Sequence, residues 1–260
     1  MSYRTTFFYQ AFLVGLSLFL LATPLWAEAI DIGSRRELLV DDFLIDSTEG
    51  DIRLQLHHPV PREIVITYDA PWEGNACGYQ AIFQDGDKYR MYYKAYHFLY
   101  EPGKLVKGHP LYACYAESED GIHWKKPDLG LFEFEGSKKN NIVWAGAGAH
   151  DFTPFKDENP ACKPDERYKA VARGGGGMIA FKSSDGIHWS QLGSGPIITD
   201  GAFDSQNLAF WDSARGEYRA YYRDFRDGRR DIKTATSPDF VKWTPLGWLE
   251  YPGAPKEHAY

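Results

Sequence analysis

The chain has 260 residues, of which 43% are hydrophobic and 16% are aromatic. This length allows one large β domain or two small ones, and the hydrophobic fraction is large enough for a core. The chain carries 29 basic and 36 acidic residues, a net charge of -7, without a block of like charge. This balance argues against nucleic-acid binding, because an acidic surface repels phosphates. The aromatic residues suit the packing of strands, and they also suit the stacking of sugar rings.

The N-terminus has the order of a secretory signal peptide. Arg4 precedes an apolar run over residues 12–21, which is followed by Pro24 and the small Ala27. The run is short for a membrane span, although an uncleaved anchor is the alternative. We therefore expect residues 1–27 to be a signal peptide, and the mature protein to be secreted or periplasmic without a membrane association.

The segment 28–70 lies between this signal and the repeated units described below. Its residues 37–46 have the composition of one or two strands. We expect the segment to cap the domain or to add an outer strand at its edge. Residues 71–260 are expected to form the repeated units.

Three cysteines, Cys77, Cys114 and Cys162, are spread along the chain, and none lies in a CxxC pair. One disulfide with one free thiol and three buried thiols are both compatible with this spacing. A cysteine-based metal site is not expected.

A short turn recurs three times after the N-terminal segment. The copies at 118–124 and 183–189 read Ser-x-Asp-Gly-Ile-His-Trp, and the copy at 237–243 reads Ser-Pro-Asp-Phe-Val-Lys-Trp. The Asp-Gly pair predicts a tight hairpin, because Gly tolerates a positive φ and Asp bonds the local backbone. The Trp is expected to start the next strand. The acids and imidazoles of this turn are therefore expected to be structural: Asp120, His123, Asp185, His188 and Asp239.

Each turn follows a β-like stretch and a second shared element further upstream. This element spans residues 83–93 in the first unit and 210–222 in the third, and it contains a longer loop in the middle unit, over 155–172. In each unit an aromatic residue and an Asp close one strand. A turn and a strand with alternating aromatic residues then follow.

Each unit therefore reads as four antiparallel strands, and the spacing of about 50 to 80 residues is typical of the blades of a β-propeller. The predicted fold is all-β, with three blades between residues 71 and 251 and the start of a fourth at 257–260. Three blades do not close a ring, because propellers have about four or more. We therefore expect the propeller to be incomplete in this chain.

The motifs resemble those of the five-bladed propeller glycoside hydrolases of families 32, 43, 68, 117 and 130 and their secreted relatives. The shared features are the Ser-x-Asp-Gly-x-x-Trp hairpins, the Phe-x-Asp and Gly-x-Tyr-x-x-Tyr-Tyr strands, and acidic residues before each first strand, over residues 72–260. The turn also resembles the Asp-box of sialidase-like propellers, but it is one residue shorter between Asp and Gly. The resemblance implies a carbohydrate substrate and a central pocket that is lined by the first strand of each blade.

The chain also departs from these families. It lacks the Trp-Met-Asn-Asp-Pro opening of family 32. The stretch 223–225 is similar to the Arg-Asp-Pro motif of that family, but it follows a second strand instead of lying on a first. Its role is therefore not carried over, and no single family is assigned.

One polar cluster lies at the start of each unit, where the resemblance places the shared pocket. The clusters supply four candidate catalytic carboxyls: Glu73, Asp151, Asp204 and Glu257. Their neighbours are candidates for substrate binding: Trp72, Asn75, His150, Gln206 and His258. Glycoside hydrolysis needs two carboxyls, one to protonate the leaving oxygen and one to activate water or attack the sugar. An acid before a strand also commonly caps a turn, and an imidazole often serves as an ordinary hydrogen-bonding group.

Two functions from different classes fit this pattern. The first is a secreted glycoside hydrolase, and the alternative is a non-catalytic propeller that binds carbohydrate or protein. A lyase or a phosphorylase is a third outcome, but a phosphorylase needs a basic phosphate pocket, whereas the axial clusters read as acidic or neutral.

The mixed-charge stretch 223–231 reads as a solvated turn. Because this stretch has many side-chain oxygens, a bound calcium ion is an alternative. No other cofactor is expected.

Overall fold

The computed structural model describes residues 29–34, 37–39, 41–253 and 255. The predicted signal peptide and the candidate residues Glu257 and His258 lie outside these residues. No helix in the described part of the chain is long and apolar enough to cross a membrane. The three cysteines are free thiols.

The chain separates into two compact units, Met1–Pro61 and Arg62–Tyr260. The described residues of the first unit form no helix or strand. The strand expected over 37–46 is therefore not seen in the part of that range that the structure describes. The second unit holds all the described strands.

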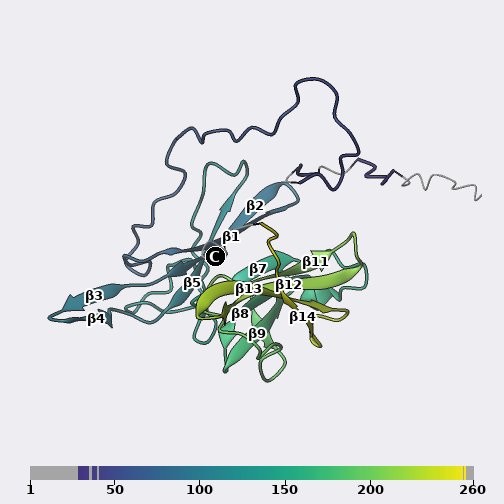
Figure 1. The fold of residues 1–260 in the computed structure, drawn as a ribbon. Coiled ribbons are helices and arrows are strands. Elements are labelled where there is room, and N and C mark those ends of the chain that lie inside the picture. The colour runs from purple at the N-terminus through teal and green to yellow at the C-terminus, as the bar shows by residue number, and fades with distance from the viewer. Residues whose placement is uncertain (1–28, 35–36, 40, 254, 256–260) are drawn as a thin grey trace, which may run out of the picture. The chain divides into compact units, whose positions relative to one another are not determined.

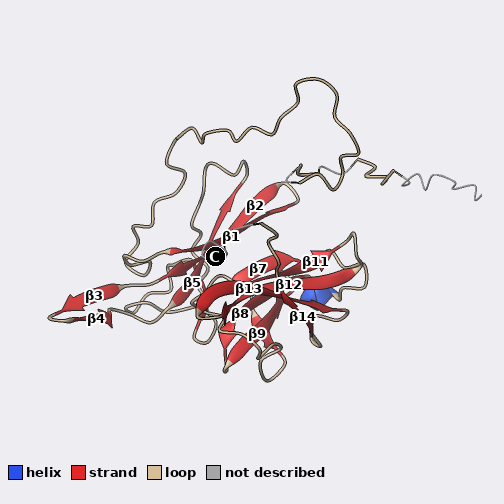
Figure 2. Cartoon of the chain, viewed as in Figure 1, coloured by secondary structure: helices blue, strands red, loops and turns tan. Residues whose placement is uncertain are grey.

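Three four-stranded antiparallel sheets form the second unit, as the repeats predict (Figure 1). The first sheet has the order β1-β2-β5-β6, with β1 (Gly78–Asp85), β2 (Lys88–Ala95), β5 (Tyr112–Ser118) and β6 (Ile142–Ala145). The second has the order β7-β8-β9-β10, with β7 (Thr153–Lys156), β8 (Tyr168–Gly174), β9 (Gly177–Ser183) and β10 (Ser190–Leu192). The third has the order β11-β12-β13-β14, with β11 (Leu208–Asp212), β12 (Glu217–Arg226), β13 (Arg229–Ser237) and β14 (Thr244–Trp248). Outside these sheets, Figure 2 shows one two-stranded hairpin, one short 3₁₀ turn, η1 (Pro164–Glu166), and loops.

The first blade differs from the predicted pattern in two ways. A separate hairpin, β3 (Phe98–Glu101) and β4 (Lys104–Lys107), is inserted between β2 and β5. In addition, the fourth strand does not begin at Trp124, because β6 starts only at Ile142. In the other two blades the fourth strand begins directly after the Trp of the turn, as predicted.

The repeated turn has the predicted hydrogen bonds. In the second blade, Oδ1 of Asp185 accepts hydrogen bonds from the backbone N–H groups of Ile187 and His188, both at 2.8 Å. The indole N–H of Trp189 donates to the carbonyl of Gly186 at 3.0 Å. The equivalent aspartates of the other blades make the same backbone contacts. These acids therefore build the turn.

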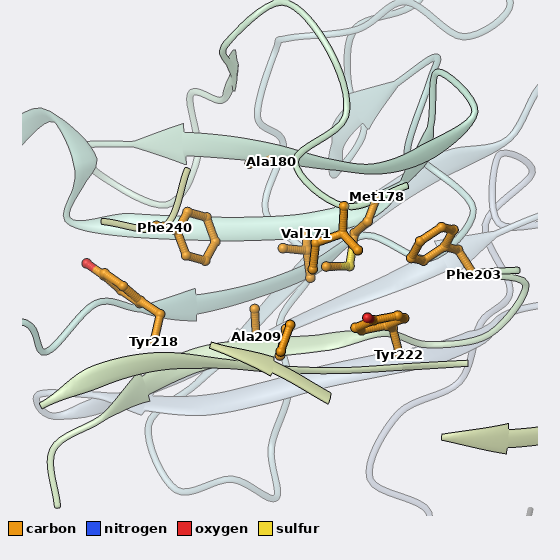
Figure 3. Packing of buried hydrophobic residues seen from close by; sticks show 11 residues of the cluster. Val171, Met178, Ala180, Phe203, Ala209, Tyr218, Tyr222 and Phe240 are labelled. Carbon is orange, nitrogen blue, oxygen red and sulfur yellow. The ribbon is translucent and has the colours of Figure 1, made fainter. Parts of the chain in front are cut away.

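The hydrophobic core lies between neighbouring blades. Figure 3 shows the cluster between the second and third blades, in which Val171 and Met178 lie opposite Ala209 and Tyr222. Phe240, which replaces the glycine of the third turn, is completely buried in the same cluster. Because each blade covers an apolar face of the next, burial of this surface holds the blades together.

A repeated polar contact also joins neighbouring blades. Tyr168 on β8 donates its hydroxyl to Asp85 at the end of β1, at 2.6 Å. Tyr218 on β12 donates in the same way to Asp157, at 2.6 Å. The innermost strands β1, β7 and β11 lie next to one another. The residues that precede these strands therefore come together, although they are far apart in the sequence.

Candidate functional site

The residues around the starts of the innermost strands form a polar group that we call the axial cluster. It consists of Lys94, His150, Asp151, Arg173, Asp204, Asn207 and Arg223. Its members come from all three blades.

Asp151 lies at the buried centre of the axial cluster, and its side chain is completely buried. Its carboxylate accepts a hydrogen bond from the backbone N–H of Arg173 at 3.0 Å and one from Nδ2 of Asn207, also at 3.0 Å. Burial raises the pKa of Asp151 to about 7, although these hydrogen bonds act in the opposite direction. Asp151 therefore changes its charge close to neutral pH.

Asp204 is exposed, and its carboxylate lies near two guanidinium groups. Nη1 of Arg173 is 3.4 Å from Oδ1, and Nη1 of Arg223 is 3.5 Å from Oδ2. Arg223 also donates to the backbone carbonyl of Asp204 at 2.9 Å. Arg173 thus contacts Asp151 through its backbone and Asp204 through its side chain. The structure brings these two candidate carboxyls into one cluster.

Two amide side chains tie the third blade to the others. Nδ2 of Asn207 bonds Asp151, while its Oδ1 accepts from the backbone N–H of Arg223 at 3.2 Å. Both ends of this amide are used, so its orientation is fixed. Gln206 donates to the carbonyl of Gln80 on β1 at 3.0 Å. The candidate Gln206 therefore joins the first and third blades.

His150 lies half-buried in the same cluster. The ring of Tyr79 packs edge-on against it, with 5.4 Å between centroids, and Nζ of Lys94 lies 4.5 Å from the Tyr79 centroid. Nδ1 of His150 is buried without a hydrogen-bond partner among the described residues. Burial lowers the pKa of His150, and the charges of Lys94 and Arg173 lower it further. The neutral imidazole is therefore favoured.

The three basic members of the cluster occupy one repeated position. The second strands of the blades align at three tyrosines, which pair with the serines that open the repeated turns: Tyr89, Tyr168 and Tyr218. The fifth residue after each tyrosine is basic: Lys94, Arg173 and Arg223. The distance from the shared tyrosine is thus the sequence signal that identifies them.

This basic position corrects two expectations. Arg223 does not lie on a solvated turn, because its side chain is buried and bonds Asp204. The axial groups are also not only acidic or neutral, because Lys94 and Arg173 belong to them. The reason is that strand alternation turns these second-strand positions towards the residues that precede the innermost strands.

The carboxylate of Glu73 makes its hydrogen bonds within the first blade. It is completely buried, and its carboxylate accepts hydrogen bonds from the hydroxyl of Tyr93, from Nζ of Lys126 at 2.7 Å and from the backbone N–H of Ala70 at 2.8 Å. None of these groups belongs to the axial cluster. The structure therefore does not bring Glu73 together with Asp151 and Asp204.

Trp72 and Asn75 also have partners in the first blade. The indole N–H of Trp72 donates to Oδ1 of Asn141 at 2.6 Å. The amide of Asn75 bonds both the N–H and the carbonyl of Phe98, at 2.8 and 2.9 Å, and thereby anchors the inserted hairpin. These contacts place both residues outside the axial cluster.

Near the stretch 223–231, carboxylates pair with basic side chains. Arg226 pairs with Glu250 at 2.9 Å, and Lys233 pairs with Asp224 at 2.8 Å. In the described part of the chain, no group of three or more His, Cys, Asp or Glu side chains is placed to hold a metal ion. Cavities of about 310 Å³ and about 460 Å³ lie beside the β12–β13 hairpin and beside His97, respectively.

The chain has a curated relative, although no family model matches it. An uncharacterised protein of Mycobacterium tuberculosis is 31% identical over 151 residues, which cover 55% of this chain and 41% of that protein. The chain therefore spans less than half of the length of this relative.

Among solved structures, the chain is similar to Zg3597, a family 117 glycoside hydrolase of the marine bacterium Zobellia galactanivorans. The TM-score is 0.51 at 14% identity, and the match covers 73% of this chain and 51% of that one. A β-fructofuranosidase from Schwanniomyces occidentalis matches with a TM-score of 0.47 at 16% identity, over 70% of this chain and 36% of that one. The likeness to the family 117 structure confirms the predicted fold, which is a β-propeller of four-stranded antiparallel blades of the five-bladed glycoside hydrolase type. The chain spans about half of the length of that structure.

Proposed function

We propose that this chain is a secreted glycoside hydrolase-like protein that cleaves glycosidic bonds at the axial cluster. The observation that carries the proposal is that Asp151 and Asp204, from two different blades, both contact Arg173. The fold shared with a family 117 glycoside hydrolase supports carbohydrate as the substrate class, by analogy of fold. The N-terminal sequence supports export.

Asp204 is the carboxylate that contacts the sugar in this proposal. It is exposed, and its two carboxylate oxygens lie 3.4 and 3.5 Å from the Nη1 atoms of Arg173 and Arg223. The second role in glycoside hydrolysis, to activate water or to attack the sugar, needs a carboxylate that the sugar can reach. Asp204 therefore acts as the base or the nucleophile.

Asp151 is a positioning residue, because a completely buried carboxyl does not touch a substrate. It holds the backbone of Arg173 and the amide of Asn207. Asn207 in turn accepts a hydrogen bond from the backbone N–H of Arg223. Asp151 is therefore linked to both arginines that lie beside the Asp204 carboxylate. Asp151 thus fixes the two cations that surround Asp204.

The second catalytic carboxyl of the proposal is Glu257. Glu73 is less suited, because its carboxylate is buried and paired with Lys126. Glu257 opens a fourth repeat in the sequence, at the position that corresponds to Asp151 and Asp204 in their own repeats. Its assignment as the general acid rests on that sequence position.

One observation favours the alternative, a non-catalytic carbohydrate-binding propeller. Of the three candidate carboxyls among the described residues, Glu73 and Asp151 are buried and Asp204 is exposed. A single exposed carboxylate, flanked by basic and aromatic side chains, suffices to bind a sugar but does not hydrolyse one by the two-carboxyl route.

A hydrolysis screen of the full chain against a glycan panel, with reducing ends as the readout, tests the proposal. We expect Asp204→Asn to lower the rate on the cleaved glycan by about 10²- to 10⁴-fold, the usual contribution of a catalytic acid or base. Asp227→Asn, at the exposed β12–β13 turn, is the matched control and should keep the wild-type rate. Equal rates for the two variants would exclude the catalytic role of Asp204. Glycans that bind without being cleaved would support the alternative.

A further inference from the structure

We infer that the axial cluster selects a negatively charged sugar, which carries a carboxylate or a sulfate group beside the bond to be cleaved. The inference rests on the proposed function for the location of the sugar, and it adds the chemical class of the ligand. The juxtaposition that carries it is the repeated basic position: Lys94, Arg173 and Arg223.

The three cations meet although they come from three different strands, β2, β8 and β12. Arg173 and Arg223 lie on the two sides of the Asp204 carboxylate, at 3.4 and 3.5 Å. Nζ of Lys94 lies 4.5 Å from the centroid of the Tyr79 ring, and that ring packs against the His150 imidazole at 5.4 Å between centroids. The cluster is therefore one basic site and not three separate surface charges.

The cluster has more positive than negative charge. Three cations face two carboxylates, Asp151 and Asp204, and burial favours the neutral form of the first of these near pH 7. Lys94 has no carboxylate within ion-pair distance among the described residues, and its ammonium lies over the ring of Tyr79. Burial lowers the pKa of Lys94, and the charges of Asp151 and Asp204 act in the opposite direction.

Hydrogen-bond donors in the cluster also remain available. The two contacts of Asp204 with Arg173 and Arg223 are longer than the about 2.7–2.9 Å of a charge-assisted hydrogen bond. The Nε atom of Arg223, whose residue is only 5% exposed, is buried without a partner in the part of the chain that the structure describes. The side chain of Arg173 is 53% exposed, so its guanidinium can reach a planar carboxylate or a sulfate of a bound sugar.

A sugar is the form of anion that fits the remaining groups. The half-buried rings of Tyr79 and His150 lie against one another next to Lys94 and offer apolar faces. Asp204, between the two arginines, offers an acceptor for a sugar hydroxyl. A ligand that combines hydroxyls, an apolar ring face and one negative group matches this set of side chains.

Titration calorimetry on the full chain tests the inference independently of turnover. The probes are oligogalacturonate and its methyl ester, and a sulfated galactan oligosaccharide and its desulfated form. We expect wild-type protein to bind at least one acidic form about tenfold more tightly than its neutral partner, the effect of one charge-assisted hydrogen bond. The two pairs distinguish a carboxylate from a sulfate.

Two variants and one control complete the experiment. Lys94→Gln and Arg173→Gln should each reduce the preference for the acidic form about tenfold, and circular dichroism confirms that each variant folds. Lys138→Gln, on an exposed loop of the first blade, removes the same charge and should leave the preference unchanged. Equal affinities for acidic and neutral forms, or equal effects of Lys94→Gln and Lys138→Gln, overturn the inference.

Two further outcomes separate this inference from the proposed hydrolysis. If acidic glycans bind in preference but are not cleaved, the proposed hydrolysis fails and the inference stands. If inorganic phosphate accelerates cleavage and a sugar phosphate is released, the basic residues bind inorganic phosphate and not an acidic sugar. That outcome overturns the inference.

Discussion

Two opposing effects act on the carboxyl of Asp151. Complete burial disfavours its charge, whereas hydrogen bonds from Arg173 and Asn207 favour it, and burial has the larger effect on its pKa. The folded protein therefore holds this proton more tightly than the unfolded chain, in which the pKa of Asp is about 3.9. The resulting contribution to stability is complete below about pH 4, and it is lost as the pH rises through about 7.

This linkage predicts a specific pH dependence for Asp151→Asn, a residue that does not titrate. We expect the unfolding free energy of wild type, minus that of the variant, to fall by up to about 4 kcal/mol between about pH 4 and pH 8. Urea denaturation of both proteins across that range measures the difference. The loss of the hydrogen bond from Asn207 adds only a constant offset. A difference that does not change with pH would contradict the assignment.

At the scale of structural elements, the repeated turn does more than reverse the chain. The carbonyl of Gly186 accepts a hydrogen bond from Tyr92 at 2.8 Å, and Tyr92 belongs to the preceding blade. Gly186 has a φ of +79°, and a Cβ at this position would lie 2.8 Å from Nη1 of Arg90 and 2.9 Å from the hydroxyl of Tyr92. The turn of the second blade is therefore packed against β2 of the first.

This packing predicts a large effect of Gly186→Ala. We expect it to lower the unfolding free energy by about 2–4 kcal/mol, from the strained backbone together with the crowding of Arg90 and Tyr92. Gly216→Ala is the matched control, because Gly216 also has a positive φ but no atom lies near its Cβ position. That variant should lose only about 1 kcal/mol. Chemical denaturation measures both, and equal losses would show that the contact between the blades does not matter.

The elements that repeat were predictable from the sequence, and those that do not repeat were not. The three turns and their flanking strands follow from one motif whose hydrogen bonds are local. The hairpin of β3 and β4 belongs to the first blade alone. In the stretch after Trp124, Lys126 pairs with the buried carboxylate of Glu73, a contact between residues far apart in the sequence.

At the scale of the whole molecule, the propeller arrangement creates the candidate site. Asp151 and Asp204 could be predicted to meet, because each precedes an innermost strand and these strands lie next to one another. The direction in which a side chain points before a strand could not be predicted. Glu73 lies five residues before β1, whereas Asp151 lies two residues before β7, and only the latter reaches the axial cluster.

The basic residues of the cluster follow a sequence pattern, but the sequence alone did not indicate their place in the site. Their positions are encoded in the repeat, five residues after a shared tyrosine. In sequence, however, Arg223 lies in a stretch of mixed charge that resembles a solvated turn. Its burial and its contact with Asp204 in the folded protein identify it as a member of the cluster.

The central claim is that a glycan binds where the blades converge on Asp204. A crystal structure of the Asp204→Asn variant soaked with an oligosaccharide that the wild-type protein binds tests it most directly. The claim predicts sugar density within hydrogen-bond distance of Arg173 and Arg223. Density confined to the cavity beside the β12–β13 hairpin or to the one beside His97, with the axial cluster unoccupied, would contradict it.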